Sequence, residues 1–80
     1  MDDWLQEARD RLAAGGGEDP TALALSQHEI DELLELARIA AHESGERTNA
    51  PLLCYLVGLV HGRRGGELDD LVDAAVSKKA

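Results

Sequence analysis

An uncharged, mostly apolar run is the feature that most constrains how this chain can fold. Nothing between Ala50 and Val60 carries a charge, although Asp, Glu, Lys and Arg make up 30% of the 80 residues. The run is much shorter than the ~18 to 20 apolar residues that a membrane-spanning helix requires. We therefore expect protein to cover it, either from the same chain or from a companion.

This run predicts a helix that is buried on all sides. Asn49 is a favourable N-cap, and Pro51 stands in the first turn, where its missing N–H costs nothing. Apolar residues point in every direction around the axis between Pro51 and His61, which is typical of a buried helix. Small residues on one side should admit a close neighbour; they are Cys54, Gly58 and Gly62. We expect this helix to be the central strut of the fold.

The second helix has the clearest start signal. Ser26 followed by Glu29 is a capping box, and Gly45 supplies the left-handed residue that ends a helix. One stripe at helical spacing is predicted to face the core; it consists of Ile30, Leu33, Leu34, Ala37, Ala40, Ala41 and Ser44. Leu36 and Ile39 lie outside that stripe. They are candidate contacts for a partner.

Two more helices complete the predicted fold. The first has an apolar side, is capped by Asp2 or Asp3, and stops at the glycines 15–17. Residues 15–25 read as a loop, and the last helix spans about 67–76. No segment alternates with a period of two. The sequence predicts an all-α fold, a single domain of residues 1–80 built as a compact orthogonal or irregular four-helix bundle with a buried third helix.

Charge and composition exclude several classes of function. The formal charge of −8 repels phosphate backbones and anionic lipids, so we expect neither nucleic acid nor a membrane as partner. A lone cysteine excludes an internal disulfide. The start MDDW lacks a basic region before an apolar stretch, so no secretion signal is expected. A cytoplasmic location fits these features best.

No residue pattern predicts catalysis, a cofactor or a metal. His28, Glu35 and His42 follow one another at heptad spacing, about 10 Å of rise apart, so one ion cannot reach two of them. Glu35, Arg38 and His42 are better interpreted as a charged surface ladder. Cys54 lies among apolar residues, where a thiol has no cause to ionise, and no base is near it in the sequence. We expect no enzymatic activity.

One polar group could hold an anion. Arg47, Thr48 and Asn49 stand at the entrance of the third helix, with His42 upstream. A helix N-terminus and an adjacent arginine favour phosphate. The alternative is that Asn49 caps its own helix while Arg47 pairs with an acidic neighbour, Glu43 or Glu46. Two more arginines, 63 and 64, either compensate the carboxyl end of the third helix or hold an acidic partner.

Several short motifs resemble those of a family of small actinobacterial helical domains of unknown function. The matching residues are Asp3, Trp4 and Leu5; Leu36, Ala37, Arg38, Ala41 and His42; Glu46, Arg47, Ala50, Pro51 and Leu52; and Leu56 and Gly58. The resemblance covers most of the chain from Met1 to Gly62. Cys54 and Tyr55 depart from it, since a Thr and an apolar residue are usual there.

The resemblance implies a helper protein. Such domains occur alone or fused behind nucleotidyltransferases similar to molybdenum-cofactor guanylyltransferases, which attach a guanine nucleotide to molybdopterin. Two hypotheses follow. The first is a non-enzymatic interaction module that forms a homodimer or docks on such a transferase, with Leu36 and Ile39 as contacts. The alternative is a module that binds a phosphate or a pterin nucleotide through His42, Arg47 and Asn49.

Overall fold

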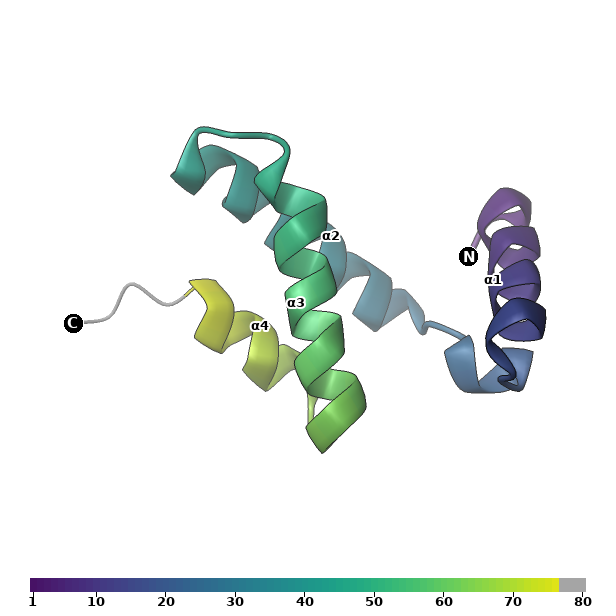
Figure 1. Ribbon diagram of the computed structural model, residues 1–80. Helices are drawn as coiled ribbons and strands as arrows, with labels where there is room; N and C mark the ends of the chain where they lie inside the picture. Colours follow the sequence, from purple (N-terminus) through teal and green to yellow (C-terminus); the bar gives the residue numbers. More distant parts are fainter. Residues whose placement is uncertain (77–80) are drawn as a thin grey trace. The chain divides into compact units, whose positions relative to one another are not determined.

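The computed structural model describes residues 1–76 and separates the chain into two units, Met1–Ile30 and Asp31–Ala80. The regular elements of the described residues are all helical (Figure 1): α1 (Asp3–Gly16), the 3-10 helix η1 (Pro20–Leu23), α2 (Gln27–Ser44), α3 (Asn49–Arg64) and α4 (Leu68–Val76). The all-α prediction with four α-helices is confirmed. None of these helices combines the length and apolarity needed to cross a membrane. The single-domain prediction stays a prediction.

The Met1–Ile30 unit consists mainly of α1 packed on η1, with Ala13 buried. Asp2 is the N-cap of α1, because its carboxylate accepts the N–H of Leu5 at 2.7 Å. The helix ends at Gly17, whose φ of 73° is a left-handed conformation that glycine adopts without strain. Both boundaries agree with the sequence signals.

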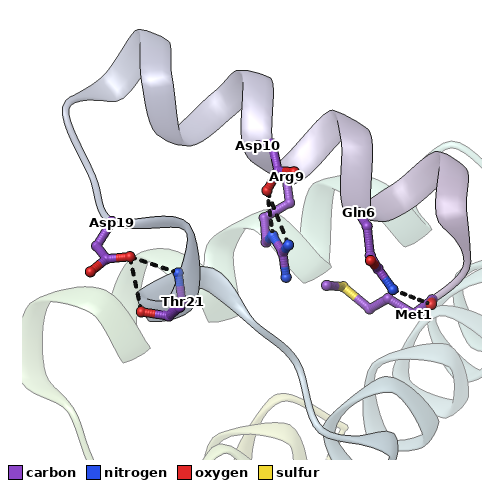
Figure 2. A network of polar contacts seen from close by, with 6 residues as sticks. All are labelled: Met1, Gln6, Arg9, Asp10, Asp19 and Thr21. Carbon is purple, nitrogen blue, oxygen red and sulfur yellow. Dashed lines mark hydrogen bonds and ion pairs between the residues drawn. The ribbon is translucent and has the colours of Figure 1, made fainter.

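The segment between α1 and α2 contains a turn that the sequence did not predict. Asp19 caps η1, and its carboxylate accepts the backbone N–H of Thr21 at 3.0 Å and the Thr21 hydroxyl at 2.9 Å (Figure 2). These two hydrogen bonds hold the pKa of Asp19 below its ordinary value, and the bond from the backbone N–H has the larger effect.

On α1 the guanidinium of Arg9 pairs with its neighbour Asp10 at 3.0 Å (Figure 2).

The start of α2 is the predicted capping box. The N–H of Glu29 donates to Ser26 Oγ at 3.1 Å, and the N–H of Ser26 donates to Glu29 Oε1 at 2.8 Å. At the other end Gly45 has a φ of 74° and donates its N–H to the Ala41 carbonyl at 3.0 Å. Local signals therefore set both ends of α2.

The core lies in the Asp31–Ala80 unit, where α2, α3 and α4 meet. Leu36 of α2, Val57 of α3, and Leu68 and Val72 of α4 form one buried cluster. Leu33, Leu53, Cys54, Leu71 and Val76 pack around it. In Figure 1, α3 crosses α2, and α4 runs back obliquely from the lower end of α3, with which it is in contact. The return uses a turn in which Gly65 and Gly66 have positive φ and the His61 ring lies 3.1 Å from the Gly66 carbonyl.

The face of α2 that packs on the core differs from the predicted stripe. Leu36, predicted to lie outside the stripe, is fully buried, whereas Leu34 within it is 65% exposed. The α2 sequence carries apolar residues over more than half of its circumference, so periodicity alone does not decide which of them turn inward. The interpretation of Leu36 as a partner contact is therefore wrong.

Candidate functional site

The third helix is open to solvent along one side. Val57 is its buried residue, whereas Leu52 is 60%, Tyr55 67%, Leu56 55% and Val60 42% exposed. We call these four residues the α3 stripe. The prediction of a helix buried on all sides is wrong for this chain by itself. The physical reason is that α2 and α4 cover the side that carries Leu53, Cys54 and Val57, and the four exposed side chains point away from that side.

The α3 stripe is a continuous apolar surface. At 100° per residue its four members fall within about 140° of the helix circumference, and Val57 lies outside that arc. Moving one side chain of this size out of water is favourable by about 1.5 to 3 kcal/mol of transfer free energy. A cluster of them on a small acidic chain is typical of a protein interaction site.

A groove adjoins the α3 stripe and shares two of its residues. It has a volume of about 620 Å³ and is mainly apolar. Its walls come from three helices of the same unit: Ile39, Ala40, Glu43 and Ser44 from α2; Asn49, Leu52, Leu53 and Leu56 from α3; and Ala75 and Val76 from α4. Stripe and groove together form one mainly apolar surface, with Glu43, Ser44 and Asn49 as its polar members.

The structure separates the five residues singled out from the sequence. Ile39 and Asn49 line the groove, whereas Leu36 is in the core. Arg47 lines a different, shallow hollow with Gly45, Glu46, Thr48 and Pro51. His42 is exposed on α2 and lines neither. The three residues proposed for an anion, His42, Arg47 and Asn49, therefore do not come together in either of these two hollows.

Two backbone donors at the entrance of α3 are already used. Thr48 occupies the N-cap position without a side-chain bond, so the prediction of Asn49 as N-cap is wrong by one residue. The N–H of Asn49 donates to the Glu46 carbonyl at 3.0 Å, and that of Ala50 donates to the Arg47 carbonyl at 3.1 Å. Pro51 has no N–H, and Glu46, an acidic residue, lines the same hollow as Arg47. The start of α3 therefore offers an anion fewer free N–H donors than an ordinary helix N-terminus does.

The small residues of α3 do not form the predicted close contact. Gly58 and Gly62 are exposed, and a Cβ atom on either would point into open space. Only Cys54 of that set packs against the core, with its Sγ 3.9 Å from the Leu33 carbonyl. Burial raises the pKa of the Cys54 thiol. This agrees with its interpretation as a small hydrophobic residue.

The charged ladder on α2 is present in part. Arg38 donates to Glu35 through Nε at 3.1 Å and through Nη2 to the other carboxylate oxygen. This hydrogen bonding lowers the pKa of Glu35 and raises that of Arg38. Both side chains are more than half exposed, so the pair contributes little to stability.

Comparison with known protein families matches residues 1–80 to the family described as "Domain of unknown function (DUF6457)". The chain belongs to this family. No curated protein and no solved structure matches it. The DUF6457 match confirms that the chain is a small domain of an uncharacterised family. The actinobacterial origin and the fusion to nucleotidyltransferases stay expectations from the resemblance.

Sequence reasoning on this DUF6457 chain missed which side of α3 would be exposed. The sequence did contain a signal that some side of α3 would be exposed, because it has too few helices to cover every side of an apolar helix. The periodicity of α3 does not show which side that is, since its apolar residues surround the axis. The position of the core residues on α2 and α4 decides it, and that is a tertiary property.

Proposed function

We propose that this chain is a non-enzymatic, cytoplasmic interaction module that docks on another protein through the α3 stripe. The observation that supports the proposal is the exposure of Leu52, Tyr55 and Leu56 on a helix without charge from Ala50 to Val60. Leaving them in water is unfavourable, and covering them by a partner removes that cost. The adjoining groove adds a concave surface that a side chain of the partner can enter.

The resemblance stated above suggests where such a module acts. A helper of a nucleotidyltransferase of molybdenum-cofactor synthesis would need a docking surface and no chemistry of its own. The described residues contain no strand, whereas the transferase needs a parallel sheet with a glycine-rich loop. We propose that the transferase, or a second copy of the chain, covers the α3 stripe.

The geometry favours this proposal over the small-ligand alternative. A phosphate or pterin nucleotide at the entrance of α3 would need converging donors. Two of the backbone N–H groups there donate to carbonyls within the turn, and His42 does not line the hollow that contains Arg47. A protein partner that covers the α3 stripe needs no converging hydrogen-bond donors.

Sedimentation velocity tests the proposal. The full chain is measured alone and mixed with the molybdenum-cofactor guanylyltransferase of the same organism, beside the variant Leu52→Glu/Leu56→Glu and the control Leu34→Glu. Leu34 is an equally exposed leucine on α2, outside the α3 stripe. We expect the wild type to associate, the stripe variant to bind at least about tenfold more weakly, and the control to resemble the wild type.

Two results would contradict the proposal. One is a wild type that sediments as a monomer at all concentrations and does not bind the transferase. The other is an association that Leu34→Glu weakens as much as the stripe variant does, since binding would then not depend specifically on the α3 stripe.

A further inference from the structure

We infer that the partner of the α3 stripe is a second copy of this chain, with the two α3 helices antiparallel about a two-fold axis near Leu56. This inference rests on the proposed function and names the partner. The arguments come from the placement of apolar and charged residues along α3.

The first argument is the symmetry of the α3 stripe. Leu52 and Val60 lie four residues before and four residues after Leu56, about 6 Å along the axis in each direction at 1.5 Å per residue. A two-fold axis at Leu56 therefore sets Leu52 of one copy against Val60 of the other, and Leu56 against itself. The same patch covers itself, as an isologous interface requires.

The second argument is charge. The helix carries no charge from Ala50 to Val60, so a second copy can approach the α3 stripe despite the net charge of −8. Arg63 and Arg64 stand at the carboxyl end of α3, whereas Glu43 and Glu46 stand at the corner before its start. Within residues 1–76 neither arginine forms an ion pair.

These charges decide the direction of pairing. In a parallel pair, the four guanidinium groups of Arg63 and Arg64 would meet at one end, and the glutamates would meet at the other. In an antiparallel pair, the arginines of each copy come alongside Glu43 and Glu46 of the other copy. Arg47 at that corner offsets part of this gain. Antiparallel helix dipoles favour the same direction.

Cysteine cross-linking tests the arrangement in the full chain. In a Cys54→Ala background, one cysteine is introduced as Leu52→Cys, Leu56→Cys or Val60→Cys, and a short bis-maleimide is added. We expect Leu56→Cys to cross-link with itself. Leu52→Cys and Val60→Cys should each cross-link poorly alone, because equivalent residues lie at least about 12 Å apart. A mixture of these two variants should cross-link efficiently.

The outcomes separate this inference from the proposed function. Efficient self-linking of Leu52→Cys and of Val60→Cys, without gain in the mixture, would show a parallel pair and overturn the inference. A monomeric wild type that binds the transferase, with binding lost in Leu52→Glu/Leu56→Glu, would overturn the second copy as partner and leave the proposed function standing. A chain that binds neither itself nor the transferase would overturn both.

Charge reversal provides an independent readout. We expect Arg63→Glu/Arg64→Glu to weaken self-association about tenfold at low salt and less at high salt, because salt screens exposed charges. Adding Glu43→Arg/Glu46→Arg to the same chain should restore the association. The new glutamates at 63 and 64 of one copy then face the new arginines at 43 and 46 of the other, so the attraction returns with its charges reversed. Failure of the combined variant to recover, when its circular dichroism shows a folded chain, would overturn the antiparallel pairing.

Discussion

Leu34 and Leu36 stand two residues apart on α2, yet Leu34 is 65% exposed and Leu36 is fully buried in the cluster with Val57. Both residues are leucines, so their side-chain size and helix propensity are the same. Substituting each by alanine therefore isolates the effect of burial.

We expect Leu36→Ala to lower the free energy of unfolding by about 2 to 5 kcal/mol, through lost transfer free energy and the cavity left behind. Leu34→Ala should change it by less than about 1 kcal/mol. Urea unfolding followed by circular dichroism measures both. Similar losses for the two variants would mean that α2 does not present Leu36 to the core.

The capping box at the start of α2 should behave as a coupled pair. Ser26→Ala removes the acceptor for the Glu29 N–H and should cost about 0.5 to 2 kcal/mol of unfolding free energy. Glu29→Ala removes the acceptor for the Ser26 N–H. Because the two bonds hold one backbone geometry, the double variant should cost less than the sum of the single variants. Strict additivity would contradict a reciprocal cap.

The Glu35 carboxyl should titrate below its ordinary range because of Arg38. A carboxyl whose pKa is lower in the folded than in the unfolded chain stabilises the fold above the unfolded-state pKa, and this contribution is lost as the pH falls through the folded-state pKa. The loss for Glu35 therefore lies on the acid side of about pH 4.3, the ordinary pKa of glutamate. NMR titration should show the Glu35 pKa rising in Arg38→Gln and unchanged in the control Arg63→Gln.

The thiol of Cys54 should react slowly while the chain is folded. Burial raises its pKa, so little thiolate is present at neutral pH, and access is limited as well. With a chromogenic disulfide reagent we expect a rate at least about tenfold below that of a cysteine at the exposed Tyr55 position, made as Tyr55→Cys in a Cys54→Ala chain. Urea should abolish the difference. Equal rates in the folded proteins would place Cys54 on the surface.

Local features of the fold could be predicted from the sequence. The Asp2 cap, the Ser26 and Glu29 capping box and the Gly45 terminus depend on residues no more than four positions apart, and the structure contains all three. The start of α3 was displaced by one residue, because Thr48 and Asn49 are both acceptable there and the turn from Glu46 decides between them.

The orientation of the helices could not be predicted from periodicity. Leu36 and Leu52 exchanged their expected environments: the first lies in the core and the second on the surface. A helix with apolar residues on several sides is compatible with several neighbours, and only the fold of the whole unit selects one side. Ile39 and Asn49, both singled out from the sequence, line the groove that adjoins the α3 stripe, and their roles as contacts stay predictions.

Tyr55 gives the most direct test of the central claim, that the α3 stripe binds another protein. It is the single tyrosine of the chain and is 67% exposed, so its ring resonances can be followed alone. Spectra are recorded while the chain is diluted and again while the transferase is added, with Trp4 on α1 as an internal reference. The proposal predicts that the Tyr55 signals shift or broaden on association while those of Trp4 change less. Tyr55 signals that stay constant across both series would contradict it.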